Sequence, residues 1–567
     1  RYIVFTRIDA DWYSQIYIGD SESGAIYKIS DAAGSYNDPR FSADGRLVYY
    51  VNDNDIHYLY LERHLAEMTF FERQEYAEKN VTKNALGLPT VMLDFDGIAD
   101  RDVQLTHQGD IESTIMSPNS ATLVYITSAG QIERVNLDGS DQKVVISNLP
   151  SPSGLQFSPR GEIVYVRDGK GRIQSINLQD GTATPLFISG EIDIDRKQEM
   201  MHVFDQVWAT LKAYFYDPEM HGVDWDNIRE IYLPRAQVAT EPNDIYDIIS
   251  EMTGELDCSH IMIWRDKPRT GETGMLGILP DYEDNSAGLK VKYIFSGSPA
   301  ARLSSELRLE DKITAVEGKK LNANVDYYEA FENTVGTEIK LDIFSRDGIS
   351  RSVLITPVGA EECYDFEYRD NLARTRNLVD NLSNKKLAYI HLKQMDNDGM
   401  DGFENELAQQ LDGKQGLILD IRGNVGGNNH EELLECLSRK PYVTHKTRDG
   451  DVGQDARGAI TTPIVLLTDE NTTSDAEIFA LGFRELGLGT IMGMTTYGAV
   501  VGAKYSSLVN GWRLGVPTVG WYSLKGEALE NNGVAPDIVV FRDLSRLERG
   551  EDNQLEEAVK YLTSKIK

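Results

Sequence analysis

Cysteine and histidine are scarce in this chain. Its 567 residues include only three cysteines, an odd and widely spaced set that indicates neither a disulfide framework nor a zinc site. These are Cys258, Cys363 and Cys436. The nine histidines form no HxxxH or HxH pair, which argues against a histidine-rich metal site.

Long apolar runs and an excess of basic charge are missing too. No run of about 18 apolar residues occurs, so no segment is predicted to insert into a membrane. The net charge is −33, from 90 acidic and 57 basic residues, and such a surface should repel nucleic acid and anionic membranes. No signal peptide is visible. The chain starts at Arg1, inside the strand-like RYIVFTRI, which predicts a processed chain or a fragment.

The N-terminal third carries a weak repeat. Three segments share one layout: a serine with a turn, an apolar strand, a polar turn and a strand of alternating polarity. They are residues 41–61, 116–137 and 157–178, and residues 2–30 give a fourth copy. Short strands repeating about every 40 residues are typical of a β-propeller. A β-sandwich has similar hairpins, but the recurring pattern favours propeller blades. We therefore predict an incomplete β-propeller over 1–192, with a helical or loop insertion at 62–100.

The pattern changes twice after residue 192. Apolar residues at helical spacing predict a small helical subdomain over 193–268. Residues 269–358 alternate strands with two short helices around a GMLG loop and a GSPAARLS helix start, the order of a PDZ domain. A PDZ groove binds a peptide as an added strand. The alternative is a PDZ fold that serves only as a spacer.

The C-terminal part predicts an α/β fold. We expect a linker at 359–375 and then, over 376–567, strands and helices in alternation, which favours a largely parallel sheet. Functional sites in such sheets lie beyond the carboxyl ends of the strands. Two of these ends stand out: the glycine-rich RGNVGG at 422–427, and Ser474 after the strand in PIVLLTDE.

Ser474 allows two interpretations. A serine between a strand and a helix is an ordinary N-cap, because its oxygen satisfies a free backbone N–H. The same junction offers N–H groups that stabilise an oxyanion, which acyl transfer requires together with a nucleophile and a base. His260, in LDCSHIMIW, is the preferred base, and His430 and His391 are its rivals. Taken alone, His260 also fits a structural role.

Several motifs together resemble the tricorn protease family and, more distantly, the tail-specific or C-terminal processing peptidases. They are FYDPEMHGVDW (215–225), GELDCSH (254–260), LDIRGNVGG (419–427), TSDAEIF (473–479), YGAVVG (497–502) and LENNGVAPDI (529–538). The resemblance covers the whole chain. It implies a multidomain fold of β-propeller-like repeats, a small helical subdomain, a PDZ domain and an α/β catalytic subdomain of the tail-specific or tricorn peptidase type.

The resemblance also implies a set of roles. Ser474 would be the nucleophile, His260 the general base, Ser259 the residue that orients His260, and Glu530 the partner of Ser259. Backbone N–H groups would form the oxyanion hole, namely those of Asp475, Val425 and Gly426. The substrates would be peptides or unfolded polypeptides, hydrolysed without a metal or an organic cofactor. A homo-oligomer and a cytoplasmic location are further expectations, with the periplasm or cell envelope as the alternative location.

Two other functions stay open at this point. One is an inactive propeller and PDZ scaffold that binds peptides. The other is a tail-specific protease with a Ser/Lys dyad. In that family a lysine follows a glycine where this chain has Ala499, and Lys504 is out of register and predicted to lie on a strand face. The sequence therefore favours the histidine relay. Cys258, next to Ser259, is expected to be buried and inert.

Overall fold

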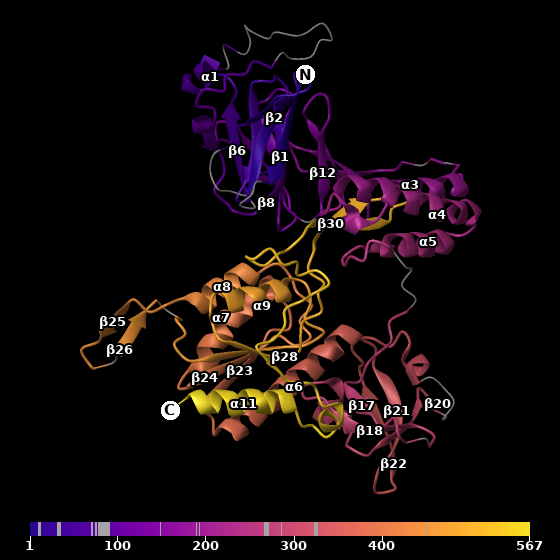
Figure 1. Ribbon diagram of the computed structural model, residues 1–567. Coiled ribbons are helices and arrows are strands. Elements are labelled where there is room, and N and C mark those ends of the chain that lie inside the picture. The colour runs from indigo at the N-terminus through magenta and orange to yellow at the C-terminus, as the bar shows by residue number, and fades with distance from the viewer. Residues whose placement is uncertain are drawn as a thin grey trace. The chain divides into compact units, whose positions relative to one another are not determined.

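The computed structural model describes residues 1–8, 13–30, 36–69, 72–73, 76, 91–147, 149–188, 190–191, 193–265, 271–284, 286–321, 327–450, 452–456 and 458–566, apart from the side chains of 397–401 and 454. The chain folds as two compact units, Arg1–Asp193 and Ile194–Lys567 (Figure 1). Residues 70–71, 74–75 and 77–90 of the insertion predicted at 62–100 lie outside the described residues. Its described part includes the short helices α1 (Arg63–Glu67) and η1 (Ala99–Arg101).

The first unit consists of four antiparallel sheets in chain order. The first holds β1 (Tyr2–Ile8), β2 (Ser14–Asp20) and β3 (Ile26–Lys28). The second holds β4 (Tyr36–Phe41), β5 (Leu47–Asn52), β6 (Asp55–Tyr60) and β7 (Asp102–Gln104). The third holds β8 (Ile111–Met116), β9 (Thr122–Thr127), β10 (Ile132–Asn136) and β11 (Lys143–Ile146). The fourth holds β12 (Ser153–Phe157), β13 (Ile163–Arg167), β14 (Ile173–Asn177) and β15 (Ala183–Leu186).

Consecutive sheets of this unit pack face to face. In β5, Val48 and Tyr50 join an apolar cluster with β2, whereas Tyr49 and Val51 join a different cluster with β8 and β9. Alternate side chains of a strand point to opposite faces, so both faces of β5 are buried. This explains why its sequence, LVYYVN, is almost continuously apolar.

The second unit begins with three helices, α3 (Arg196–Tyr214), α4 (Trp225–Val238) and α5 (Pro242–Gly254). Asp195 and Asp224 cap the first two by accepting hydrogen bonds from backbone N–H groups. The helices share their core with a sheet of β16 (Ile263–Trp264), β30 (Arg513–Val519) and β29 (Gly502–Ser507). The hairpin 502–519, assigned by sequence to the α/β part, therefore packs with the helices instead.

The next part of this unit, residues 271–358, is a six-stranded antiparallel sheet around one apolar cluster. Its main strands are β17 (Ile278–Pro280), β18 (Leu289–Ile294), β19 (Lys312–Val316), β21 (Ile339–Phe344) and β22 (Ser350–Ile355), with β20 (Lys319–Lys320) paired to β19. The short helices η3 (Pro299–Ala301), η4 (Leu303–Ser305) and η5 (Tyr327–Phe331) complete it.

The linker predicted at 359–375 is wrong. Helix α6 runs from Ala360 to Ser383 without interruption. Its sequence is highly charged, and only a narrow stripe that includes Cys363, Phe366 and Val379 is buried, so its composition resembles that of a solvated linker. The helix ends at Asn384, which adopts the left-handed conformation that commonly terminates helices.

The rest of the chain forms a parallel sheet covered by helices on both faces (Figure 1). The strands, in spatial order, are β23 (Leu387–His391), β24 (Gly416–Asp420), β27 (Ile464–Thr468), β28 (Thr490–Gly493) and β31 (Ile538–Val539). Helices α7 (Asn397–Leu411), α8 (His430–Ser438) and α9 (Asp475–Glu485) share one apolar cluster with the sheet. Helices α6 and α11 (Asn553–Lys565) share the other. Helix α10 (Leu544–Leu547) and the hairpin of β25 (Val443–Lys446) and β26 (Val452–Asp455) are peripheral additions.

Candidate active site

Ser474 lies where β27 gives way to α9, as the sequence predicts. Its backbone has φ 57° and ψ −128°, which is uncommon for a residue with a side chain and indicates a sharp turn. Ser474 and Glu477 form a capping box, in which the Glu477 carboxylate accepts the Ser474 N–H at 3.2 Å. The same buried carboxylate accepts the N–H groups of Gly498 and Ala499 at 2.7 and 2.8 Å. Glu477 thus ties the serine turn to the 496–499 loop, a role that the sequence analysis missed although the S-x-x-E spacing signals it.

His260 contacts this serine. Its Nε2 lies 3.2 Å from Ser474 Oγ, although the two residues are 214 positions apart. The distance is at the edge of the hydrogen-bond range that a nucleophile and its base require. His260 sits between α5 and β16 with a positive φ of 60°, and the pairing of β16 with β30 holds its segment in place. The fold therefore brings together the predicted nucleophile and base.

Ser259 and Glu530 lie on the Nδ1 side of the His260 imidazole, whereas Ser474 lies on its Nε2 side. Ser259 Oγ is 2.8 Å from His260 Nδ1 and 3.1 Å from Glu530 Oε2. Because an ionised carboxylate only accepts, the single hydroxyl proton of Ser259 goes to Glu530, and Ser259 Oγ then accepts from Nδ1–H. This assigns the tautomer whose Nε2 lone pair faces Ser474.

The Glu530 carboxylate is held firmly. It is 5% exposed and accepts the Ser259 N–H at 2.6 Å and the N–H of Val500 at 2.8 Å. Burial lowers the pKa of His260 below its usual value, and the negative charge of Glu530 opposes that effect only in part. His260 is therefore neutral, and able to take a proton, at neutral pH.

The glycine-rich turn lies directly against the serine. A Cβ added at Gly426, whose φ is +89°, would come within 2.6 Å of Ser474 Cβ and 2.7 Å of Asp475 N. The N–H of Gly426 donates to Asn424 Oδ1 at 2.8 Å, so this predicted oxyanion donor is already engaged. The N–H groups of Val425 and Asp475, in contrast, have no hydrogen-bond partner among the described residues. Asp475 is the first residue of α9, where a free N–H is expected.

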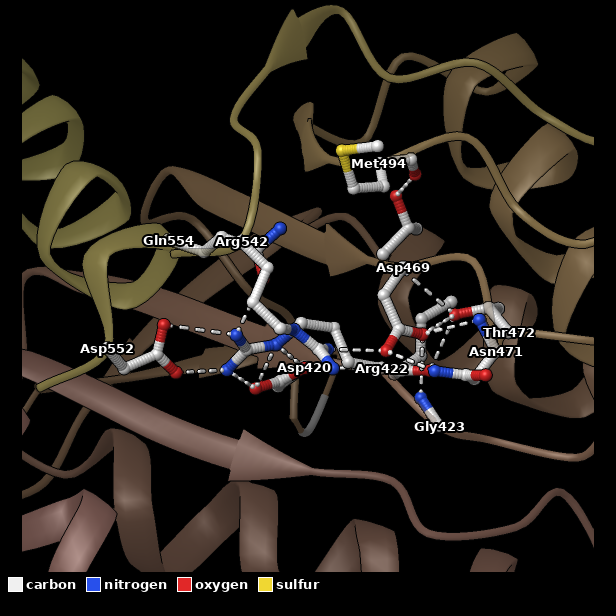
Figure 2. A network of polar contacts seen from close by, with 12 residues as sticks. Asp420, Arg422, Gly423, Asp469, Asn471, Thr472, Met494, Arg542, Asp552 and Gln554 are labelled. Carbon is white, nitrogen blue, oxygen red and sulfur yellow. Dashed lines mark hydrogen bonds and ion pairs between the residues drawn. The ribbon is translucent and has the colours of Figure 1, made fainter. Parts of the chain in front are cut away.

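A buried polar network supports both turns from behind (Figure 2). Asp469 Oδ1 accepts the N–H of Gly423 at 2.8 Å and the hydroxyl of Thr472 at 3.1 Å. One carboxylate oxygen thus joins the start of the glycine-rich turn to the start of the serine turn. The other oxygen accepts from Arg542 at 2.6 Å. No local sequence pattern indicates Asp469 or Arg542, because their contact joins segments 73 residues apart.

A second ion pair in this region involves Arg422. Its guanidinium donates to Asp420 at 2.7 Å and to Asp552 at 2.8 Å, as Figure 2 shows. Asp420 is 1% exposed, and the Arg422 charge lowers the pKa of its carboxyl against the opposing effect of burial. The pair anchors the strand that leads into the glycine-rich turn.

The remaining candidates are placed elsewhere. His430 pairs with the Asp475 carboxylate, and His391 lies between Tyr368 and the carbonyl oxygen of Arg422, so neither contacts Ser474 Oγ. Lys504 is exposed on β29, which confirms its prediction as a strand-face residue. The carbonyl oxygen of Ala499 accepts the Ser474 N–H at 2.9 Å.

Cys258 lies beside Ser259 and is partly buried. Burial raises the pKa of its thiol, and the neighbouring Glu530 charge adds to the effect, so the thiol is protonated and unreactive at neutral pH. Among the described residues, no group of three or more His, Cys, Asp or Glu side chains is placed to hold a metal ion.

Two family models match the chain. Residues 386–540 match peptidase family S41, and residues 196–254 match the tricorn protease C1 domain. Both models describe parts of peptidases, and this is the class of protein that the two segments resemble.

Comparison with individual proteins gives a more specific similarity. The chain is 29% identical over 460 residues to tricorn protease homolog 2 of Streptomyces coelicolor, an alignment that covers 76% of this chain and 38% of that protein. It is 26% identical over 386 residues to the tricorn protease of Thermoplasma volcanium, an alignment that covers 65% of this chain and 37% of that protein. The crystal structure of the tricorn protease is similar with a TM-score of 0.79 at 19% identity, covering 100% of this chain and 59% of that one. The chain is therefore similar to tricorn proteases in both sequence and fold.

The chain spans less than two fifths of the length of these two relatives. In the ranges that the structure describes, no helix combines the length and the apolar character that crossing a membrane requires.

Proposed function

We propose that this chain hydrolyses peptide bonds through a relay of Ser474, His260, Ser259 and Glu530. The observation that carries the proposal is the unbroken set of contacts from Ser474 Oγ through the imidazole to the buried carboxylate. In the first step His260 Nε2 takes the proton of Ser474 while Oγ attacks the carbonyl carbon of the substrate. The result is a tetrahedral intermediate with an O–C bond to Ser474 and a negatively charged oxygen.

The N–H groups of Asp475 and Val425 are the proposed donors to that oxygen. Donors that are already aimed at the developing charge stabilise the transition state without reorganising. In this proposal Gly426 contributes through its missing side chain and not as the N–H donor that the resemblance implies. The missing side chain lets the turn approach Ser474, while the N–H donates to Asn424. Val425 is 64% exposed, so its side chain is free of the packing behind the turn, and its backbone alone would serve.

The imidazolium formed in this step is stabilised by Ser259 and Glu530. The imidazolium then gives its Nε2 proton to the leaving amine, the peptide C–N bond breaks, and Ser474 carries the acyl group. Water attacks this ester with His260 again as the base, which releases the carboxylic acid and restores Ser474. A serine backed by a carboxylate thereby performs the orienting role that an aspartate has in other relays.

We further propose the finer architecture that the family implies. The four face-to-face sheets of the first unit support an assignment as β-propeller blades. The strand order of residues 271–358 supports a PDZ domain. A groove of about 190 Å³ between the GMLG loop, β17 and η5 would take a peptide as an added strand. The proposed substrates are peptides or unfolded polypeptides, handled by a homo-oligomer in the cytoplasm.

Mass spectrometry after incubation with a fluorophosphonate probe tests the catalytic proposal. We expect a single adduct on Ser474 in the wild type and none in Ser474→Ala. His260→Ala should lose the reaction by several orders of magnitude, whereas a Ser/Lys dyad would tolerate that change. Absence of an adduct from well-folded wild-type protein would favour the scaffold alternative.

A further inference from the structure

A second imidazole contacts the serine turn through Asp475. His430 is the first residue of α8, and its backbone N–H donates to Asp475 Oδ2 at 3.0 Å. Its ring Nδ1–H donates to Asp475 Oδ1. The Asp475 side chain is only 6% exposed, and the residue directly follows Ser474. The relay described above uses neither side chain.

The position of this carboxylate poses an electrostatic problem. The Asp475 N–H is a proposed donor to the oxyanion, so a negative charge develops beside a residue that already carries one. In a buried site, where the effective dielectric constant is low, two like charges repel strongly. The reaction is therefore faster if a cation neutralises the Asp475 carboxylate. Among the described residues, the only group seen to pair with this carboxylate is His430.

We propose that His430 is a positioning residue that fixes Asp475 by two hydrogen bonds and, when protonated, cancels its charge beside the oxyanion site. This inference rests on the proposed function. Both hydrogen bonds come from groups that donate in either protonation state of the ring, the backbone N–H and Nδ1–H. Titration at Nε2 therefore changes the charge of the pair and leaves its geometry intact.

The surroundings of His430 favour the charged form. Burial lowers its pKa, but the hydrogen bond and charge of Asp475 on α9, with Glu431 and Glu432 on α8, outweigh burial and raise the pKa above its usual value. From the segment after β30, the Trp521 ring packs edge-on against the imidazole, with centroids 5.7 Å apart. Among the described residues, these are the groups that the contacts place against His430.

The pKa values of the two histidines near Ser474 are thus shifted in opposite directions. Burial lowers the pKa of His260, which must be neutral to accept a proton, and Asp475 raises that of His430, which must be charged to compensate. The reaction rate should rise with pH as His260 loses its proton and fall again as His430 loses its own. The Cys258 thiol is no source of the alkaline limb, because its pKa is raised far beyond this range.

The test is the pH dependence of the rate at which a fluorophosphonate modifies Ser474, from about pH 5 to about pH 10, a range that brackets histidine titration. Three variants are compared with the wild type. His430→Asn keeps a side-chain donor near the Nδ1 position but has no charge. Asp475→Asn removes the charge to be compensated. His202→Asn, on the exposed side of α3, is the matched control.

We expect a bell-shaped profile for the wild type and for His202→Asn. His430→Asn should keep the acid limb, lose the alkaline limb and react about tenfold more slowly at the optimum, the effect of one pKa unit of coupling. Asp475→Asn should also lose the alkaline limb. A purely structural role would lower the rate and leave both limbs in place, and an alkaline limb that survives in His430→Asn overturns the proposal. A wild type that does not react at all refutes the proposed function itself.

Discussion

Gly426→Ala should disable the site while leaving most of the fold intact. The new methyl group would lie 2.6 Å from Ser474 Cβ and 2.7 Å from Asp475 N, against the ~3.5–4.0 Å at which carbon atoms pack. The glycine-rich turn and the serine turn must therefore separate by about 1 Å, and a misplacement of that size costs on the order of 100-fold in rate. The left-handed φ of +89° adds about 1–2 kcal/mol of backbone strain for a residue with a Cβ.

Gly423→Ala is the matched control in the same turn. Gly423 has a φ of +71°, so alanine there carries a similar backbone strain, but nothing lies within 4 Å of the added Cβ. Fluorophosphonate labelling and peptide hydrolysis should fall at least ~100-fold in Gly426→Ala and change little in Gly423→Ala. Urea denaturation should show a loss of about 1–2 kcal/mol in Gly423→Ala, from backbone strain alone, and a further loss of about 1–3 kcal/mol in Gly426→Ala, from the clash. A Gly426→Ala protein that reacts like the control would falsify the close approach as a requirement for activity.

Two further predictions concern the support of the site. Ser259→Ala removes the acceptor of His260 Nδ1–H, and we expect a loss of up to ~10⁴-fold in kcat/KM, comparable to losing the orienting group of a catalytic histidine. Ser259→Thr, which keeps the hydroxyl, should recover part of it, and equal activity of the alanine variant would contradict the assigned tautomer. Arg542→Ala leaves the buried Asp469 carboxylate without its cation, so the free energy of unfolding should drop by about 3 kcal/mol in urea titrations. An unchanged unfolding midpoint in that variant would show that Asp469 is satisfied by its backbone and hydroxyl donors alone.

Local sequence patterns predicted many of the elements but not the site. The junction before Ser474 and the parallel strands were predictable, because apolar runs and helix caps are local signals. The convergence of the site residues was not predictable in this way. Ser259 and Glu530 are 271 positions apart, and His260 and Ser474 are 214 positions apart, so only the family resemblance indicated that they meet. The hairpin 502–519 was misassigned for the same reason: its pairing with β16 is a long-range contact without a local signature.

Polar side chains that act through other residues were the hardest to predict. The sequence indicated His430 only as a rival base, although its N–H is the first of α8 and needs an acceptor. What the sequence hides is that the cap is Asp475, which comes from another helix. For Gly426, the resemblance implied an N–H donor to the oxyanion, whereas in the folded turn this N–H donates to Asn424 and the missing side chain permits the close approach to Ser474.

The two interpretations of Ser474 turn out to be compatible. Ser474 takes part in a capping box with Glu477, and its Oγ also lies within reach of His260 Nε2. A hydroxyl has two lone pairs and one proton, so it can accept at the helix end and still donate to an imidazole. The helix end in turn leaves the Asp475 N–H without a partner, because the first N–H groups of a helix have none within it. The geometry that makes serine a good cap at this position therefore also supplies a free donor beside the proposed attacking oxygen, and in the proposed mechanism helix formation and oxyanion stabilisation draw on the same backbone groups.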